Sequence, residues 1–552
     1  MTATPAPPGL ATTGTPALVG RAMTGTPALV RLALRRDRLL LPSWVAVIAG
    51  LVTASASAIA ELYPQAAQRI ALGVTIGSAP ALQALTGPVY DAASVGGLTA
   101  WRVTTMASVL AALMSILVVI RHTRAEEESG RAELVGACPV GRHALPASGV
   151  LVAAGANLLI GVLITLGLAG QGLPVAGSLA FGAAVSGTGW TFTGVAVLAG
   201  QLTAHARTAS AVAVAALGAA FLLRALGDAA RIEALSWLSP LGWAQRVRAF
   251  AGERWWVLIL FAATGPALAG LAALLARRRD LGAGLLAPRS GPRDAAASLR
   301  GTVALAWRLH RGVLLGWTAA FTIGGALFGA LAHSVGDLVR DNPQLAALLS
   351  RMGGGAGLLT DTFLAAELSV LGLIAGGYAV QATLRLQGEE SALRADPVLA
   401  TAVPRWRWAA GHLGMALAGS AAILAAGGVA AGVTHGLRIG EPALQVPRLL
   451  GAALVQVPAT WTLAGIAMLL FGLLPRLTAL AWAALIAFAL LAQLGELLQL
   501  DDRIRSLSPF AHVPRALPGP VDPGPLLGLC LVTMVLVLAG VLAFQRRDLR
   551  GD

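Results

Sequence analysis

Two acidic stretches lie between apolar segments of this chain. Residues 125–137 read AEEESGRAELVGA, and residues 388–400 read GEESALRADPVLA. General acid and base catalysis would need two carboxyl groups in contrasting environments, one of them removed from water. Here the carboxylates are sequence neighbours in a loop that also carries arginine. The pattern therefore argues against a catalytic pair and favours a short, solvated helix.

The acidic residues suit the start of such a helix, where negative charge stabilises the helix dipole. Glu127 with Arg131, and Glu390 with Arg394, have the i, i+4 spacing of helical ion pairs, each worth about 0.2–0.5 kcal/mol. So weak an interaction does not explain why the helix occurs twice. A short cytosolic helix that occurs twice on a membrane domain with two-fold symmetry favours docking to a partner that also has two-fold symmetry. A purely structural helix is the alternative.

The composition places the helices in a bilayer. Of 552 residues, 56% are hydrophobic and 12% charged, and the mean hydropathy is +0.74, which is outside the range of soluble domains. About a dozen segments have the ~20 apolar residues that cross a membrane. Aromatic residues make up only 5%, which favours helices packed through small residues over a β-barrel. We expect an all-α polytopic membrane protein.

The net charge is +14, and all of the basic residues counted in it are arginine, since the chain has no lysine. The arginines cluster between apolar segments, as the positive-inside rule predicts, so we expect no nucleic-acid partner. The two cysteines, Cys138 and Cys530, fall in a loop and in the last span, which excludes a disulfide framework. Residues 1–30 lack a continuous apolar core and are expected to be a disordered cytosolic tail rather than a signal peptide. Translation could start at Met1 or Met23.

The chain is a fused duplication. The acidic stretch aligns Glu127, Glu128 and Ser129 with Glu389, Glu390 and Ser391, followed by a one-residue insertion. Other matched segments occur in the same order in both halves. They begin or end at Trp44 and Trp317, Pro80 and Pro343, Trp190 and Trp461, Leu238 and Leu507, and Arg278 and Arg546.

Each half is predicted to contain six spans, giving twelve in all. Residues 31–280 form the first half, 281–300 a cytosolic linker and 301–552 the second half. An even number of spans gives both copies one orientation. The loops after the even-numbered spans hold most arginines, which predicts a multi-pass plasma-membrane protein with cytosolic termini and cytosolic acidic stretches. The predicted spans are 40–61, 103–120, 145–169, 177–203, 207–226 and 255–276, then 311–332, 362–384, 409–434, 449–475, 477–497 and 525–544.

Several enzyme sites are excluded by residue type. A phosphate-binding loop needs a lysine, so any ATPase that drives this chain is a separate polypeptide. The eight histidines have no metal-binding spacing, and there is no G-x-S-x-G nucleophile motif. We therefore expect neither catalytic residues nor a metal or other cofactor in this chain.

The segments EEESGRAEL…PVGR and GEES…R…VPR, the basic helix before each first span and the LSPLGW segment resemble a known family. It comprises membrane permeases of actinobacterial ATP-binding-cassette exporters of the multidrug or polyketide-antibiotic (tetronasin) type, and the similarity runs from about residue 31 to the C-terminus. The resemblance implies a type V exporter fold. In that fold an elbow helix precedes the first span, and a coupling helix follows span 2 of each half, here about residues 126–142 and 389–405. A helical hairpin lies outside between spans 5 and 6.

The resemblance also implies a partner, a separate ATPase subunit present in two copies that holds ATP and Mg²⁺. Gly388 replaces Glu126 and Pro397 replaces Leu134 in the second copy, so the two docking sites are expected to differ. The expected coupling residues are Glu127, Glu128, Ser129, Arg131, Glu133 and Arg142, with Glu389, Glu390, Ser391, Arg394, Asp396 and Arg405.

The substrate is expected to be an amphiphilic small molecule, carried through a cavity lined by polar or aromatic residues of the spans. Repeat symmetry would bring Trp190 and Trp461 near one axis. A proton-driven secondary transporter is the alternative, although Glu367 is the main acidic residue within a span; a membrane enzyme lacks any convergent set of groups. The candidate cavity residues are Asn157, Thr188, Trp190, Thr191 and Phe192, with Phe321, Tyr378, Gln456, Thr460 and Trp461.

Overall fold

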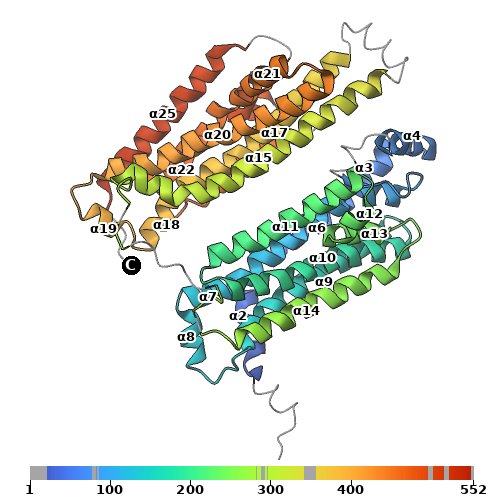
Figure 1. The fold of residues 1–552 in the computed structure, drawn as a ribbon, viewed down its shortest axis with the longest axis horizontal. Coiled ribbons are helices and arrows are strands. Elements are labelled where there is room, and N and C mark those ends of the chain that lie inside the picture. The colour runs from blue at the N-terminus through green and yellow to red at the C-terminus, as the bar shows by residue number, and fades with distance from the viewer. Residues whose placement is uncertain are drawn as a thin grey trace, which may run out of the picture. The chain divides into compact units, whose positions relative to one another are not determined.

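The computed structural model is helical, and its described part contains no strand. It divides into two compact units, Met1–Gly291 and Pro292–Asp552 (Figure 1). Among the described residues, eleven helical segments are long and apolar enough to cross a membrane, which confirms the expected all-α polytopic membrane fold. The described residues are 22–77, 83, 86–280, 282–286, 293–294, 296–340, 356–494, 501–514, 517 and 521–548.

Unit 1 contains six of the eleven spans. The two most buried are α6 and α10, so these two helices form the centre of the bundle, and α3, α11 and α14 lie more at its surface. Its helices are α2 (Thr26–Arg36), α3 (Leu40–Leu62), α4 (Ala66–Gly77), α6 (Val95–His122), α7 (Arg124–Glu128), α8 (Arg131–Gly136), α9 (Ala144–Gly170), α10 (Val175–Leu202), α11 (Ala206–Ala229), α12 (Glu233–Trp237), α13 (Pro240–Arg246), η1 (Trp255–Val257) and α14 (Leu258–Ala276).

Unit 2 contains the other five spans and a shorter apolar helix, α23, at the position expected for the eleventh span. The end of that predicted span lies outside the described residues, so a twelfth span stays a prediction. The helices are α15 (Thr302–Arg340), α17 (Ala356–Thr383), α18 (Arg385–Ser391), α19 (Asp396–Leu399), α20 (Arg405–Ile439), α21 (Pro442–Leu454), α22 (Val457–Leu473), α23 (Leu480–Leu494), α24 (Asp502–Arg505), η2 (Pro509–His512) and α25 (Pro523–Arg546).

Some boundaries differ from the sequence expectation. Helix α2 begins at Thr26, inside the segment expected to be a disordered tail up to residue 30. Each expected coupling helix is two short helices, α7 and α8 in unit 1 and α18 and α19 in unit 2. The span expected at 449–475 is broken between α21 and α22, where Pro458 lies in the first turn of α22 and lacks the N–H that would continue the helix.

A buried ionic contact in unit 1 joins the residue that follows α2 to the end of α6. The Asp37 carboxylate, fully shielded from solvent, lies 2.6 Å from His122 Nε2 and 3.1 Å from Arg121 Nε at the end of α6. The end of α2 is therefore fixed to the central helix of the bundle. In unit 2 the matching region is continuous helix, because α15 runs unbroken from Thr302.

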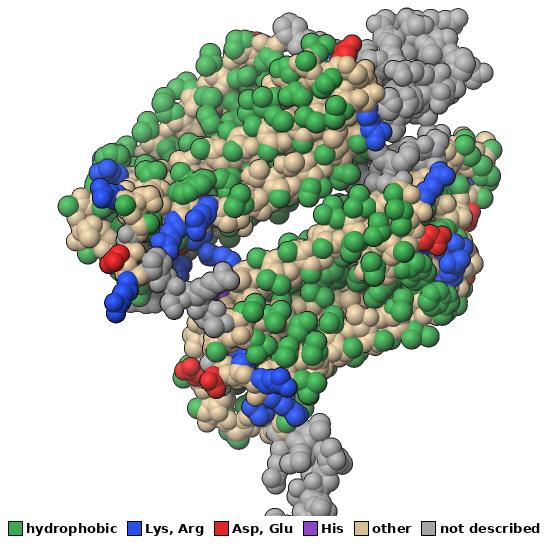
Figure 2. Space-filling model, in the orientation of Figure 1, with side chains coloured by type: hydrophobic (Ala, Val, Ile, Leu, Met, Phe, Trp, Pro, Cys, Tyr) green, Lys and Arg blue, Asp and Glu red, His purple; other side chains and the backbone are tan. Residues whose placement is uncertain are grey.

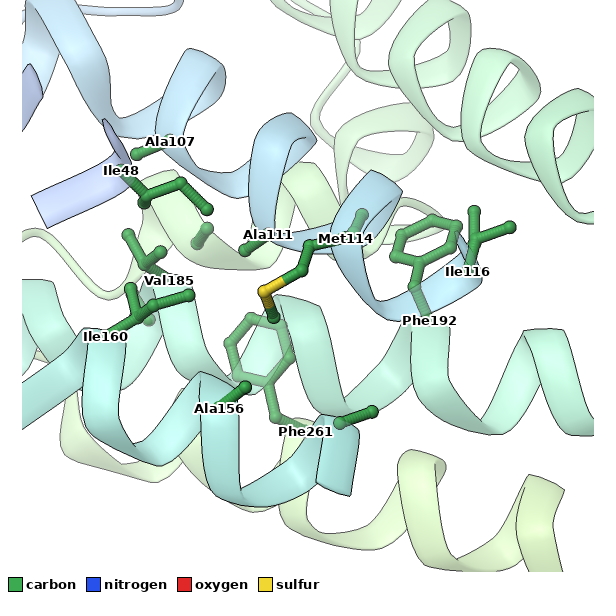
Figure 3. Close-up of a cluster of buried hydrophobic side chains, with 14 of the residues drawn as sticks. Ile48, Ala107, Ala111, Met114, Ile116, Ala156, Ile160, Val185, Phe192 and Phe261 are labelled. Carbon is green, nitrogen blue, oxygen red and sulfur yellow. The ribbon is translucent and has the colours of Figure 1, made fainter. Parts of the chain in front are cut away.

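The spans pack through buried apolar side chains and small residues. In unit 1, Met114 of α6, Phe192 of α10 and Phe261 of α14 belong to one core (Figure 3). On the face shown in Figure 2, hydrophobic side chains cover the length of each bundle and charged side chains gather at its ends. This distribution is the one a bilayer requires.

Helices α22 and α25 of unit 2 touch through glycine. A Cβ added at Gly540 would lie 2.6 Å from the Met468 carbonyl oxygen, whereas one added at Gly528 of the same helix would meet nothing within 4 Å. We expect Gly540→Ala to force the helices apart and destabilise unit 2 by about 1–3 kcal/mol. Gly528→Ala is the control and should change stability by less than about 0.5 kcal/mol. Thermal unfolding of the purified protein checks both, and equal effects would contradict the close packing.

Candidate functional site: two ionic latches

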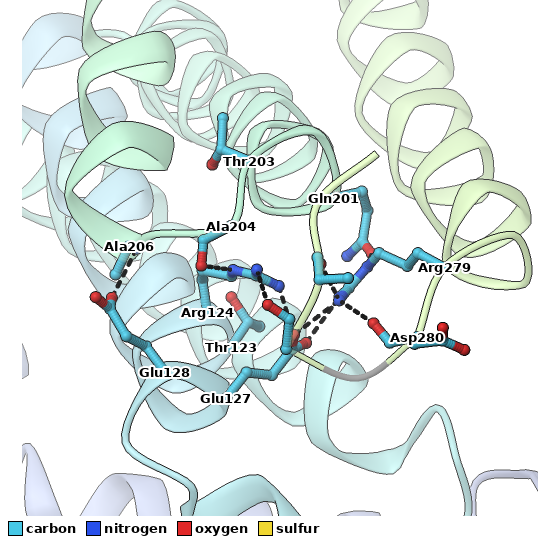
Figure 4. A network of polar contacts seen from close by, with 12 residues as sticks. Thr123, Arg124, Glu127, Glu128, Gln201, Thr203, Ala204, Ala206, Arg279 and Asp280 are labelled. Atoms are coloured by element: carbon cyan, nitrogen blue, oxygen red, sulfur yellow. Dashed lines mark hydrogen bonds and ion pairs between the residues drawn. The ribbon is translucent and has the colours of Figure 1, made fainter. Parts of the chain in front are cut away.

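The acidic stretch of unit 1 is held by arginine from two directions. Glu127 of α7 accepts two hydrogen bonds from Arg279, at 2.8 Å to each carboxylate oxygen, and one at 2.6 Å from Arg124 (Figure 4). Only 11% of the Glu127 side chain and 7% of the Arg279 side chain are exposed. A bidentate arginine–carboxylate pair removed from water is both strong and geometrically specific. We call Arg124, Glu127 and Arg279 the first latch.

The first latch joins three parts of unit 1. Arg124 donates to the carbonyl oxygens of Ala204, between α10 and α11, and of Gly282, beyond α14. Arg279, which follows α14, donates through Nε to the Gln201 side chain at the end of α10. The short helix α7 is therefore tied to the ends of the fourth and sixth spans of its own half, and a displacement of α7 would act on both spans.

Unit 2 has an equivalent arrangement. Arg547, which follows α25, donates to both carboxylate oxygens of Glu390 at 2.7 and 2.6 Å, and its guanidinium lies over the rings of Phe471 and Phe544. Gln387 replaces the arginine of unit 1 and donates to the Pro475 carbonyl oxygen, between α22 and α23. We call Gln387, Glu390 and Arg547 the second latch.

These contacts correct the alignment of the two acidic stretches. In each unit a second glutamate pairs with an arginine five residues further on: Glu126 with Arg131, and Glu389 with Arg394, at 2.9 and 2.8 Å. Glu126 therefore corresponds to Glu389, and Glu127 to Glu390. The one-residue insertion inferred from the sequence is unnecessary, and Glu128 corresponds to Ser391.

Sequence reasoning missed the arginines that complete the latches. Arg279 and Arg547 occupy the same position in the two RRDL segments, which were recognised as a repeat without a role. Each lies more than 150 residues from its glutamate, so helix spacing gave no sign of the contact. The recurrence of one arginine after each sixth span was the available signal.

The expected coupling residues fall into two groups in the structure. Glu127, Glu389 and Glu390 are largely shielded from solvent inside the ionic contacts, so their carboxylates are already engaged. Arg405 is partly buried and donates to carbonyl oxygens at the end of α25. The others have exposed side chains: Glu128, Ser129, Arg131, Glu133, Arg142, Ser391, Arg394 and Asp396.

Two exposed leucines accompany the exposed group. Leu134 of α8 is 73% exposed, and Leu393, between α18 and α19, is 50% exposed. Leu393 also has a positive φ of 54°, which is uncommon for a residue other than glycine. Each unit thus presents an apolar side chain among charged ones at the latch end. We call Glu133 with Leu134, and Leu393 with Asp396, the two outer faces.

Most of the candidate substrate residues lie inside their own bundle. Asn157 donates to Ser115 Oγ and to a carbonyl oxygen of its own helix, and Thr188 and Thr191 donate to the carbonyl four residues earlier. Hydroxyl groups in membrane helices commonly bond in this way. The remaining buried candidates are Phe192, Phe321, Tyr378, Gln456 and Thr460; their role in transport stays a prediction.

The tryptophan pair has the same contact in both units. The indole N–H of Trp190 donates to the Ala154 carbonyl oxygen at 3.1 Å, and that of Trp461 donates to the Leu417 carbonyl oxygen at 3.0 Å. Both carbonyls belong to the third span of their half. Trp190 also lines an apolar groove of about 330 Å³ between α9, α10 and α14. Trp190 is therefore a unit 1 candidate that borders open space.

We expect Trp461→Phe to lower the stability of unit 2 by about 1 kcal/mol, because the indole hydrogen bond is lost while most apolar contact is kept. Trp482→Phe is the matched control, since Trp482 is 40% exposed and its substitution should be nearly neutral. Thermal unfolding measured by tryptophan-independent light scattering compares the two. Equal midpoints for both variants would contradict a structural role for the bond.

Among the described residues, no group of three or more His, Cys, Asp or Glu side chains could hold a metal ion. His310 and His412 lie 3.0 Å apart, nitrogen to nitrogen, inside unit 2.

Comparison with known proteins gives a consistent result. Residues 299–545 match the family model described as the C-terminal domain of the multidrug efflux system permease Rv1217c. The whole chain is similar to the multidrug efflux system permease protein Rv1217c of Mycobacterium tuberculosis (strain ATCC 25618 / H37Rv). The two are 45% identical over 521 residues, which cover 94% of each chain.

Proposed function

The chain belongs to the family of multidrug efflux system permeases, and from this premise we propose that it is the membrane subunit of an ATP-driven exporter. It is a transport subunit and not an enzyme of covalent chemistry. In the proposal, a separate ATP-binding-cassette ATPase, present in two copies, binds ATP and Mg²⁺ and drives alternating access. The cargo is an amphiphilic small molecule.

The observation that carries the proposal is the pair of latches. A transporter that is driven by a separate, non-membrane subunit needs an element that this subunit can displace. That element must also be rigidly joined to the membrane spans. Helices α7 and α18 have this property, because Glu127 and Glu390 are bound through buried bidentate contacts to the arginines that follow the sixth spans. The same device in both halves suits a partner with two equal subunits.

The latch glutamates transmit force in this proposal, and the outer faces contact the ATPase. Glu133 with Leu134 in unit 1, and Leu393 with Asp396 in unit 2, combine an exposed leucine with a carboxylate. An apolar anchor surrounded by charge is typical of a protein–protein contact. Glu128 caps α11 by accepting from the Ala206 N–H, whereas the Ser391 hydroxyl donates to the Gly388 carbonyl oxygen of its own helix. This difference supports two unequal docking sites.

The absence of lysine supports a separate ATPase, because the phosphate-binding loop cannot be built without that residue. Nucleotide and Mg²⁺ therefore belong to the partner in this proposal. We place the protein in the plasma membrane with both termini and both latches in the cytosol, where the arginine-rich loops are expected. Besides the ATPase, the protein then contacts the lipids of the surrounding membrane.

Cargo movement follows from closure of the ATPase dimer. Closure displaces α8 and α18 through the outer faces, and the latches pass the displacement to spans 4 and 6 of each half. The two halves then switch an apolar cavity from inner to outer access. Trp190 and Trp461, fixed to their third spans by the indole hydrogen bonds, are our first candidates for contact with the cargo.

Transport assays in proteoliposomes test the proposal. The permease is co-expressed with an ATP-binding-cassette ATPase encoded in the same genome, and the complex should hydrolyse ATP in a vanadate-sensitive manner that candidate amphiphiles stimulate. Efflux that proceeds without ATP and stops when the proton gradient is collapsed would instead establish a proton-driven transporter. Glu367, an intramembrane carboxyl group in α17, would then be the first residue to replace.

A further inference from the structure

An apolar groove of about 560 Å³ lies at the latch end of unit 1, between α9, α10 and α14. One wall is a face of α14 whose alanines recur at helical spacing: Ala269, Ala272, Ala273 and Ala276. Their short side chains leave the hollow, and they span about 10 Å along the helix axis. Since α14 is a membrane span, the groove runs from the latch end into the hydrocarbon region. We call it the α14 groove.

Three side chains with N–H donors line the α14 groove at the latch end. They are His143 before α9, Gln201 near the end of α10 and Arg277 after α14. The fold brings them together because α9 begins at the end of the bundle where α10 and α14 finish. None of the described residues that line the groove is Asp or Glu. The groove therefore has an apolar body and a mouth rich in hydrogen-bond donors.

Gln201 is the most shielded of these three residues, with 5% of it exposed. Its Oε1 accepts from Arg279 Nε of the first latch (Figure 4). Its amide nitrogen has no acceptor in the part of the chain that the structure describes, so the N–H donors are open to an occupant of the groove. A shielded donor without an acceptor is costly. A head group that carries oxygen atoms would satisfy this donor, directly beside the latch.

The mouth of the α14 groove is positively charged. Arg277 lines it with an exposed side chain, and Arg142 precedes His143 in the chain. Burial lowers the pKa of His143, and the charges of the two arginines lower it further. The imidazole is therefore mainly neutral at pH 7 and donates through one N–H. A guanidinium and two neutral donors thus face the same space.

Two other apolar grooves of unit 1 lack this combination. The groove beside Trp190 has no charged residue in its described lining. A groove of about 580 Å³ between α2, α3 and α9 is lined by Arg38 but also by the Asp37 carboxylate. The α14 groove joins an apolar body to positive charge that no carboxylate of its described lining opposes. This complementarity selects an occupant with an apolar chain and an anionic head.

We propose that the α14 groove binds an anionic phospholipid from the leaflet on the latch side. The phosphate lies at His143, Gln201 and Arg277, and one acyl chain follows the alanine wall. Basic pockets between membrane helices bind anionic head groups, and the apolar walls favour a lipid over a free anion. Ala273 is exposed, so the chain can enter from the bilayer. The site requires no ATPase partner and no particular cargo, so it is independent of the proposed function.

Thermal unfolding of the intact chain tests the lipid site. The protein is placed in nanodiscs of phosphatidylcholine, in which the fraction of phosphatidylglycerol is raised at constant ionic strength. We expect phosphatidylglycerol to raise the unfolding temperature of the unaltered protein until the site is saturated. Inorganic phosphate added to phosphatidylcholine nanodiscs should give no comparable rise, because it has no acyl chain to occupy the apolar body.

Arg277→Gln removes the cation at the mouth and should require about tenfold more phosphatidylglycerol for the same rise. Arg278→Gln is the matched control, because Arg278 is the next residue, is exposed and lies outside the groove lining. Ala273→Trp fills the apolar body and should lose the rise. Leu274→Trp is its control, since Leu274 is 59% exposed and also lies outside the lining.

Each of four results would overturn the site: no rise with phosphatidylglycerol in the unaltered protein, an equal rise with inorganic phosphate, the same dose dependence in R277Q and R278Q, or a full rise in A273W. If A273W does not fold, A273L replaces it. Leucine fills part of the groove without an added ring, so a weakened response supports the lipid site and an undiminished response contradicts it.

Discussion

Replacing Arg547 by alanine is expected to abolish drug efflux and to destabilise unit 2 by about 3–5 kcal/mol, because the buried Glu390 carboxylate would lose its bidentate arginine partner. Arg547 is 15% exposed and Glu390 only 5%, so water cannot fully replace the lost partner. The Phe471 and Phe544 rings that the guanidinium covers would also lose a contact. Thermal unfolding and efflux from proteoliposomes measure the two effects.

Arg546→Ala is the matched control for this variant. Arg546 is the preceding residue, its side chain is exposed, and its loss should leave stability and efflux nearly unchanged. The exchange Glu390→Arg with Arg547→Glu restores opposite charges and should recover part of the stability lost in either single variant. A normal efflux rate in R547A with the protein fully folded would show that the second latch has no part in transport.

The second large effect is expected at the outer faces. The double variant L134R/L393R should lower the affinity for the proposed ATPase by at least tenfold, because each arginine would place an unpaired charge in the proposed apolar contact. Folding should be unaffected, since Leu134 is 73% and Leu393 50% exposed. Capture of the ATPase by the tagged permease, together with the unfolding temperature, separates the loss of docking from the loss of structure.

Leu286→Arg provides the comparison for that experiment. Leu286 is 65% exposed and follows the first latch in sequence, but it lies outside both outer faces. Its substitution should leave ATPase capture intact. If L134R/L393R and L286R both retain the ATPase, docking uses another surface, and the expected coupling residues at these positions lose their assigned role.

Changing both Glu128 and Glu390 to arginine would not test the two acidic stretches in the same way. Glu390 is the buried partner of Arg547, whereas Glu128 is about half exposed and caps α11. The change at Glu390 therefore acts on stability as well as on coupling. The pair Glu127 and Glu390 is the symmetric one, because both glutamates bind the arginine that follows span 6.

Much of the membrane architecture is predictable, because it depends on apolar length and on an internal repeat. The described spans occupy the predicted regions, although α20 extends beyond the expected 409–434 and the span at 449–475 is broken before Pro458. Length and hydropathy cannot show such a break, since Pro458 lies within an otherwise apolar sequence. It follows from backbone hydrogen bonding at one residue.

The ionic latches and the substrate-cavity residues could be predicted only in part from the sequence, for a different reason. Three consecutive glutamates can be aligned with two in more than one register, and the register depends on contacts to Arg131 and Arg279. The second of these arginines is 152 residues distant in sequence. Likewise, the polarity of Asn157 and Thr188 suggested a cavity, but their donors bond to neighbouring helices or to their own backbone. Polarity alone does not distinguish these uses.

Electron cryomicroscopy of the permease in complex with the proposed ATPase tests the central claim most directly. We predict that the ATPase dimer contacts Leu134 in unit 1 and Leu393 in unit 2, while the Glu127–Arg279 and Glu390–Arg547 contacts remain closed behind them. A complex in which α8 and α18 are surrounded by water, or lie on the side of the membrane away from the ATPase, would contradict the account.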